Sequence, residues 1–281
     1  MTALSVTAFT DTGLVRARNE DAILVGGWLC QTAVGAITTL TFPDSAPFVC
    51  AVADGMGGHA GGDLASRIAL GVIADAAPDW ASVLDVTAAV RSANERVCQA
   101  GVNPNLQGLG TTIAGIAVLA EHVVAFNVGD SRIYSVANGF LEQISVDDAI
   151  TDESGRPTNL VTQSLGQRQP PSPHVVTMPR DGTSYLLCSD GVSGVLSAAE
   201  LRTAALKTDP NDFAGELIRM TRERGAQDNF SMLIVTVAPV IAEPAVHATD
   251  DRLGSPQNPE RIGTEPDAMH SPAAEPAMEN S

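Results

Sequence analysis

The stretch that decides the fold of this chain runs from residue 48 to residue 62 and reads FVCAVADGMGGHAGG. Its first six residues are apolar, which predicts a buried strand that delivers Asp54 at its end. A glycine-dense turn follows and opens into an alanine-rich helix. Glycine lets the backbone approach a cation closely, so the carbonyl oxygen of Gly55 can become a ligand beside the Asp54 carboxylate. The alternative is an ordinary strand-to-helix turn in which Asp54 caps the helix.

Four further aspartates stand in short motifs along the chain: Asp21 in RARNED, Asp130 in GDSR, Asp190 in SDG and Asp228 in QDN. Each motif alone is weak evidence, because an Asp-Gly pair after a strand is usually just a turn. Jointly they are more informative, since carboxylates at strand ends repel one another unless hard divalent cations cancel the repulsion. The sequence therefore predicts a carboxylate cage for two or more Mg²⁺ or Mn²⁺ ions.

Two basic side chains accompany these acids. Arg16 precedes Glu20 closely enough to share a site with it, and the planar guanidinium suits bidentate recognition of phosphate. The alternative for Arg16 is a surface salt bridge to Glu20. His59 is the only histidine beside a motif and can act as a general acid near neutral pH. His122 and His174 lie in strand-like segments and are predicted to be structural.

Composition bounds the class of protein. The chain has 281 residues, of which 44% are hydrophobic, and no run of apolar residues is long enough for a membrane helix. The first residues lack the pattern of a secretory signal, so a cytoplasmic protein with no membrane contact is expected. The net charge of −17 argues against non-specific nucleic-acid binding, which needs basic patches. The four cysteines form no CxxC pair and are expected to be free thiols.

The chain divides by composition into a body, residues 1–238, and a tail, residues 239–281. The tail has seven prolines, no aromatic residue and a net charge of −6, which leaves −11 for the body. Such a composition has too little apolar surface to offset the entropy of ordering, so the tail is predicted to be disordered. It either tethers or docks the protein, or has no role.

The body has a distinctive predicted order of elements. Strands are expected at 4–10, 22–26, 48–53, 111–119, 122–127, 132–136, 185–189 and 230–237, and helices at 61–76, 81–100, 198–207 and 212–224. Residues 137–173 are polar and are predicted to be irregular. This order is not the strict alternation of a parallel sheet. It favours an α+β fold in which a central antiparallel β-sandwich is flanked by helix pairs.

At this point the motifs resemble those of one family, the bacterial metal-dependent protein Ser/Thr phosphatases of type 2C, also called PPM phosphatases. The resemblance covers most of residues 5–237. It rests on six motifs in the family's order: RARNED at 16–21, VADGMGGHAG at 52–61, GTT at 110–112, VGDSR at 128–132, LCSDG at 187–191 and DNFS at 228–231. The family's fold is a β-sandwich flanked by helix pairs, in agreement with the predicted elements.

The resemblance implies a binuclear or trinuclear centre of Mn²⁺ or Mg²⁺ with ligands at Glu20, Asp21, Asp54, Gly55, Asp130, Asp190 and Asp228. In it, Asp54 bridges two ions, Asp190 and Asp228 bind the first, and the Gly55 carbonyl binds the second. Asp21 or Glu20 supports the second ion, directly or through water, and Asp130 with Asp190 matches a third site of bacterial members.

The implied function is hydrolysis of phosphoserine and phosphothreonine in proteins by a metal-activated water. Arg16 matches the family's phosphate clamp, and His59 matches the proton donor to the leaving alcohol. The implied partners are phosphorylated proteins, as substrates of a bacterial Ser/Thr kinase, and the chain is expected to be a monomer. No cysteine or serine stands in a nucleophile motif.

The chain departs from the family after the GDSR motif. Asp147-Asp148-Ala149 stands where bacterial members usually carry His-Ser, and the stretch to Ser164 is short for the family's flap. Substrate preference therefore stays open. Three other functions compete with a general phosphatase: a dedicated switch acting on one phosphoserine regulator, a catalytically inactive binding module, and a plain β-sandwich interaction protein whose acids are solvated turns.

Overall fold

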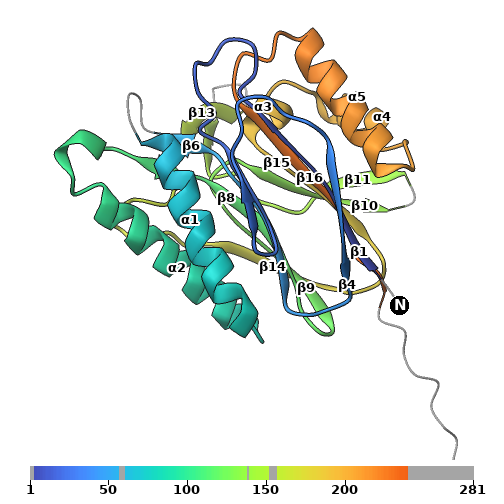
Figure 1. The fold of residues 1–281 in the computed structure, drawn as a ribbon, viewed down its shortest axis with the longest axis horizontal. Helices are drawn as coiled ribbons and strands as arrows, with labels where there is room; N and C mark the ends of the chain where they lie inside the picture. The colour runs from blue at the N-terminus through green and yellow to red at the C-terminus, as the bar shows by residue number, and fades with distance from the viewer. Residues whose placement is uncertain (1–2, 57–60, 138, 152–156, 240–281) are drawn as a thin grey trace, which may run out of the picture. The chain divides into compact units, whose positions relative to one another are not determined.

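The computed structural model of the chain describes residues 3–56, 61–137, 139–151 and 157–239. Two predictions lie outside these residues: the general acid His59, and the disorder of the tail from residue 240 onward. The described residues form the antiparallel β-sandwich with helices on its outer faces that the sequence predicts (Figure 1). The predicted α+β class is therefore confirmed.

Within the described residues, the first sheet has six antiparallel strands. In spatial order they are β11 (Phe140–Gln143), β10 (Arg132–Ala137), β15 (Ser184–Cys188), β16 (Phe230–Thr236), β1 (Ala3–Asp11) and β4 (Thr38–Pro43). The middle strands β15 and β16 are almost wholly buried because the sheet is covered on both faces. This explains why their sequences are continuous apolar runs rather than alternating ones.

The second sheet also has six antiparallel strands in the described part of the chain. In spatial order they are β14 (His174–Pro179), β9 (His122–Val128), β8 (Ile113–Val118), β5 (Phe48–Ala53), β2 (Ala22–Val25) and β3 (Trp28–Cys30). Two short ribbons accompany the sheets: β6 (Gly55–Met56) with β7 (Gly110–Thr111), and β12 (Ala149–Thr151) with β13 (Pro157–Val161). The first of these ribbons extends β5 directly toward the glycine-rich turn.

Each helix pair covers one outer face. The longer pair, which lies on the second sheet, is α1 (Gly62–Ala76) and α2 (Val83–Ala100), joined through the short helix η1 (Ala77–Asp79). The shorter pair, on the first sheet, is α4 (Ala198–Ala204) and α5 (Pro210–Glu223). Two further short helices are η2 (Pro104–Leu106) and α3 (Asp190–Ser193). Three apolar cores result: one between the sheets and one beneath each helix pair.

The predicted strands and helices are all present, with ends shifted by a few residues, but several edge strands are additional. The prediction that residues 137–173 are irregular is wrong in part, because β11, β12 and β13 lie there. One of the four residues of β11 is buried, and the exposed ones include Glu142 and Gln143. Edge strands with mostly exposed residues lack the apolar run that identifies a strand in a sequence.

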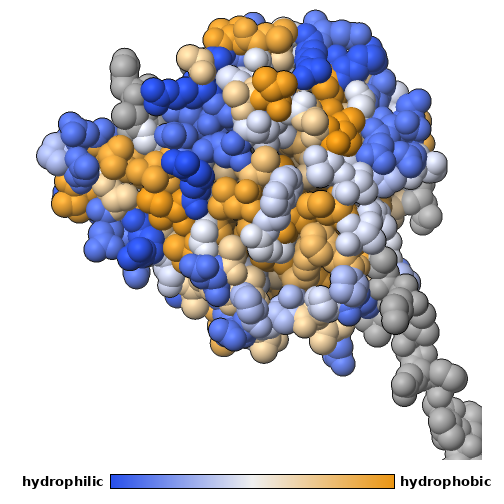
Figure 2. Space-filling view, in the orientation of Figure 1, coloured by the Kyte–Doolittle hydropathy of each residue, from blue (hydrophilic) through white to orange (hydrophobic). Residues whose placement is uncertain are grey.

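The surface and thiols agree with the compositional predictions. All four cysteines are free, and Cys50 and Cys188 are buried. None of the helices in the described part of the chain is long and apolar enough to cross a membrane. Figure 2 shows that the surface over α5 is mainly hydrophilic, whereas hydrophobic residues gather in a band between α1 and β4.

Candidate metal centre

Strand pairing brings the five predicted metal-site aspartates to one end of the sandwich: Asp21, Asp54, Asp130, Asp190 and Asp228. In the first sheet, β10, β15 and β16 are in register at the ends next to three of them. In the second sheet, Ala22 at the start of β2 pairs with Ala53 at the end of β5. Asp21, which precedes Ala22, and Asp54, which follows Ala53, therefore lie next to each other. The negative charges of these acids act on one another across the two sheets. Residues from both halves of the sequence thus form one acidic cluster.

Asp21 is the most deeply buried of these acids. Its Oδ2 accepts hydrogen bonds from the hydroxyls of Ser189, at 2.7 Å, and Ser231, at 2.8 Å. Its Oδ1 is buried and has no hydrogen-bond partner among the described residues. Burial is the main reason that the pKa of Asp21 is raised to about 7; the serines act against this rise, and the charges of Asp190 and Asp228 add to it. A buried oxygen without a partner is costly, so Oδ1 marks a position for a proton or a cation.

Asp54 and Asp190 are hydrogen-bonded to each other at the centre of the cluster. Burial, and then the negative charges of Asp21 and Asp190, raise the pKa of Asp54 well above its ordinary value, and its carboxyl donates a hydrogen bond to Asp190. Burial also raises the pKa of Asp190. Asp130, in the turn between β9 and β10, follows the same pattern: burial, and then the charge of Asp190, raise its pKa to about 6. These acids cannot all ionise together unless a positive charge joins them.

Glu20 and Gly55 meet beside the start of α1. The Gly55 N–H donates to the carbonyl oxygen of Glu20 at 3.2 Å. A Cβ at position 55 would lie 2.1 Å from the carbonyl oxygen of Gly62, and a Cβ at position 62 would lie 2.9 Å from Glu20 Oε1. Only glycine fits at position 55, because a side chain there would collide with the Gly62 backbone, whereas a side chain at position 62 would displace the end of the Glu20 side chain. The two glycines therefore let backbone carbonyls lie within reach of the acids.

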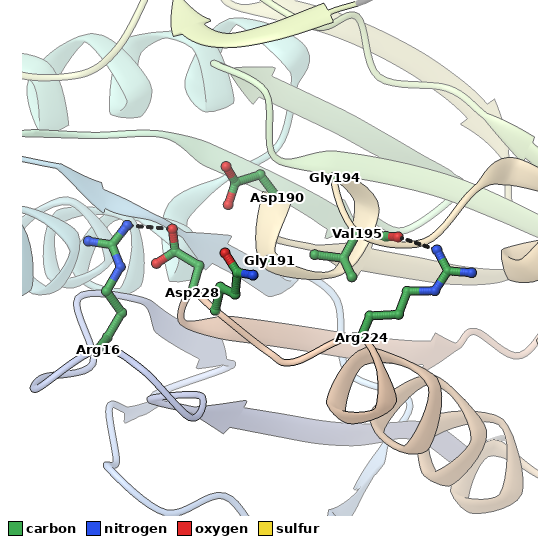
Figure 3. A pocket seen from close by; sticks show the side chains of 8 residues that line it. Arg16, Asp190, Gly191, Gly194, Val195, Arg224 and Asp228 are labelled. Atoms are coloured by element: carbon green, nitrogen blue, oxygen red, sulfur yellow. Dashed lines mark hydrogen bonds and ion pairs between the residues drawn. The ribbon is translucent and has the colours of Figure 1, made fainter.

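Arg16 stands at the open side of the cluster. Its Nη2 donates to Asp228 Oδ2 at 2.5 Å, and its side chain is half exposed. Together with Asp190 it lines a pocket of about 480 Å³. Figure 3 shows Arg16 and Asp228 joined on one side of this pocket, and Arg224 on the other side, where it donates to the Val195 carbonyl. The guanidinium can therefore face a ligand that enters the pocket beside the acids.

The residues present fit a hard divalent cation. The donors are carboxylate oxygens and a backbone carbonyl, which Mg²⁺ and Mn²⁺ prefer. The unpartnered Oδ1 of Asp21 and the repulsion between the charges of Asp54 and Asp190 are both features that a cation would relieve. The described residues do not form a preassembled set of three ligands. One oxygen of Asp228 instead accepts a hydrogen bond from Arg16.

Two alternatives from the sequence are wrong. Asp54 is not a helix cap, since the N-cap of α1 is Gly61 and no side chain caps it. Arg16 makes its salt bridge to Asp228, which is distant in sequence, rather than to Glu20. The role predicted for His59 concerns a residue outside the described part of the chain.

Sequence reasoning assigned no role to the polar residues that hold the acids in place. Asn229 accepts a hydrogen bond from the Glu20 N–H at 2.8 Å and donates to the carbonyl oxygens of Thr12 and Arg18. It therefore ties the RARNED segment to the start of β16. Thr112 similarly accepts from the Asp54 N–H at 3.1 Å. Asn229 lies inside the motif DNFS and Thr112 inside the motif GTT, and these positions are the sequence signal from which a role could have been predicted.

Comparison with known proteins identifies the class to which this fold and site belong. The sequence model of the family described as Protein phosphatase 2C matches residues 24–233. This span contains four of the five aspartates and the strands from β3 to β15. The chain therefore belongs to the protein phosphatase 2C family.

Particular relatives support this assignment. The serine/threonine protein phosphatase PstP of Mycobacterium tuberculosis is 30% identical over 278 residues, which is 90% of this chain and 50% of the relative. The chain thus spans about half the length of that curated relative. Protein phosphatase PhpP of Streptococcus pneumoniae is 28% identical, over 66% of this chain and 84% of the relative. The solved catalytic domain of PstP, in complex with 2 manganese ions, is 30% identical with a TM-score of 0.68; the match covers 85% of this chain and 100% of that one.

Proposed function

We propose that this chain is a metal-dependent protein serine/threonine phosphatase that uses two or three Mn²⁺ or Mg²⁺ ions. One observation carries the proposal: a buried cluster of mutually repelling carboxylates, with an unpartnered oxygen on Asp21, lies beside a half-exposed arginine at a pocket. Membership of the phosphatase family and the manganese-bound structure of a relative support the same reading. The experiment is phosphate release from phosphoserine and phosphotyrosine peptides. Release from the phosphotyrosine peptide alone would contradict the proposal.

The proposed ligands are the residues of the acidic cluster, namely Glu20, Asp21, Asp54, Gly55, Asp130, Asp190 and Asp228. The bound ions would supply a water of lowered pKa and polarise the phosphoryl oxygens. The chain's own residues place the substrate. Arg16 is fixed at the pocket by Asp228, and its remaining N–H groups can donate to the equatorial phosphoryl oxygens. We further propose that His59 protonates the leaving alkoxide of the phosphorylated residue.

The proposed substrates are phosphorylated proteins, made by a bacterial Ser/Thr kinase, and the protein acts in the cytoplasm as a monomer. The free thiols of all four cysteines are compatible with a reducing compartment. We place the end of the catalytic domain near residue 238. Strand β16 ends at Thr236, and the Arg180 side chain still donates to the Ala238 carbonyl at 3.2 Å.

Substituting Arg16 by alanine is expected to weaken binding of the phosphate group. A charge-assisted bidentate contact contributes about 1.5–3 kcal/mol, so kcat/KM for a phosphoserine peptide should fall by roughly tenfold to a hundredfold. The measurement is steady-state hydrolysis by Arg16→Ala at saturating Mn²⁺. Arg18→Ala, which removes a charge two residues away, is the matched control and should leave kcat/KM within about twofold. Unchanged kinetics in Arg16→Ala would move this residue out of the site.

A further inference from the structure

The Asp147-Asp148 dipeptide, where the chain departs from its family, is bonded to the segments that carry the acidic cluster. Asp148 is 7% exposed, which is unusual for an acid far from the pocket. Its Oδ2 accepts from the Gly129 N–H at 3.0 Å, and its own N–H donates to the Gly129 carbonyl at 3.0 Å. Gly129 is the residue directly before Asp130. Asp148 therefore holds the Asp130 turn at two points.

The other oxygen of Asp148 reaches the far side of the flap. Oδ1 accepts from Gln163 Nε2 at 2.8 Å and lies 2.9 Å from His174 Nε2 in β14. The Asp148 carbonyl also accepts from the Thr162 N–H at 2.7 Å, directly after β13. Through its carboxylate and its backbone carbonyl, Asp148 thus links the Asp130 turn, the segment that follows β13 and an edge strand of the second sheet.

Asp147 makes a parallel link to the segment that carries Asp190. Its Oδ2 accepts from Arg132 Nη2 at 2.7 Å and its Oδ1 accepts from Arg132 Nε at 3.2 Å, a bidentate pair. Arg132 also donates to the Ser193 carbonyl at 3.4 Å, in the same short helix that begins with Asp190. The dipeptide is therefore connected to both segments that carry the proposed third cation site.

Gly129 lies against Thr112 in a backbone conformation that requires glycine. Its φ is +100°, and a Cβ there would lie 2.7 Å from the Thr112 side chain. Thr112 in turn bonds the Ser131 hydroxyl at 2.7 Å, on the other side of Asp130. The turn is held from both sides, by Thr112 and by Asp148, so the direction of the Asp130 carboxylate depends on these contacts.

From this geometry we propose that Asp148 is a positioning residue for the third cation site, which it aligns through its two hydrogen bonds to Gly129. His174 and Gln163 hold the other oxygen of Asp148 in place. The inference rests on the metal centre of the proposed function. Residues that orient ligands typically change metal affinity by about tenfold to a hundredfold when they are substituted. The flap and the third site are thereby coupled in this chain by a side chain that differs from the family's usual histidine.

Substituting Asp148 by asparagine tests the proposal. An amide has one acceptor oxygen, so its NH₂ group must face either the Gly129 N–H or the donors on the Oδ1 side, and one link is lost. Mn²⁺ titration by calorimetry should show the weakest-binding ion with a Kd raised by roughly tenfold, and the tighter ions should keep theirs within about twofold. In phosphoserine-peptide hydrolysis, the Mn²⁺ concentration for half-maximal rate should rise by a similar factor, and excess Mn²⁺ should recover most of the turnover.

Two further variants make the test decisive. His174→Leu removes one of the two hydrogen bonds to Asp148 Oδ1 and should raise the Kd of the same ion by about threefold, the effect expected of one hydrogen bond. This variant replaces Asp148→Asn in the test if Asp148→Asn does not fold. Asp75 is an exposed carboxylate on α1. Asp75→Asn is therefore the control for the loss of one negative charge and should leave the Kd of every ion unchanged. Mn²⁺ affinities equal to wild type in both site variants, or a wild-type protein that binds only two ions, would overturn the proposal. Calorimetry is independent of turnover, so an inactive wild type would refute the proposed function while these affinities still test the role of Asp148.

Discussion

Replacing Asp54 or Asp228 by asparagine is expected to abolish phosphatase turnover while the protein remains folded. Asp54 is hydrogen-bonded to Asp190 at the centre of the cluster, and Asp228 is bonded to Arg16 at the pocket. Cation-assisted stabilisation of the transition state is worth several kcal/mol, so the rate should fall by roughly 10³-fold or more. The measurement is hydrolysis of a phosphoserine peptide and of p-nitrophenyl phosphate at saturating Mn²⁺.

The fold should survive because these substitutions remove negative charge from a repulsive cluster. In chelator, the Tm of Asp54→Asn should equal or exceed that of the wild type. Asp79→Asn, an exposed acid in η1, is the matched control and should keep full activity. Retention of more than a tenth of the wild-type rate by Asp54→Asn would remove Asp54 from the metal centre.

The second large effect is on stability without metal. The pKa of Asp21 is raised to about 7 in the folded protein, against 3.8 ordinarily. A carboxyl with a raised folded-state pKa contributes stability that is fully present below its unfolded pKa and is lost as the pH rises through the folded one. In chelator, the ionisation of Asp21 should therefore lower the free energy of unfolding by on the order of 4 kcal/mol as the pH rises from 4 to 8. Asp130, with a pKa of about 6, adds to this loss in the same direction.

Asp21→Asn isolates this contribution, because the other titrating groups are common to both proteins. In chelator, the Tm of the variant minus the Tm of the wild type should increase by roughly 10 °C as the pH rises from 5 to 8, for a domain of this size. Saturating Mn²⁺ should remove most of the pH dependence of the wild type, since the ions take the place of the protons. A difference between variant and wild type that is the same at pH 5 and pH 8 would count against a buried, unpartnered carboxyl at this position.

The acidic cluster could be predicted from the sequence because its members stand next to the ends of apolar runs. Asp54 directly follows β5, which is buried along nearly its whole length, and Asp190 comes two residues after the end of β15. Such runs identify central strands, and their ends meet at the edge of a sandwich. The edge strands β4 and β14 alternate or mix exposed and half-buried residues, so they carry no comparable signal.

Contacts between distant residues could not be predicted in the same way. The pairing of Asp148 with His174 spans 26 residues, and that of Arg16 with Asp228 spans 212. Neither follows from periodicity, because each depends on how two strands from different parts of the chain are placed side by side. The sequence marked Asp148 only as a departure from the family, and the structure shows what it contacts.

The central claim is that catalysis needs divalent cations held by this acidic cluster. The most direct measurement is phosphate release from a phosphoserine peptide by the full chain, first stripped with excess chelator and then titrated with Mn²⁺ at pH 7.5. The account predicts no turnover above background in chelator and full recovery as Mn²⁺ is added back, with no recovery in Asp54→Asn. Full turnover in excess chelator would contradict it.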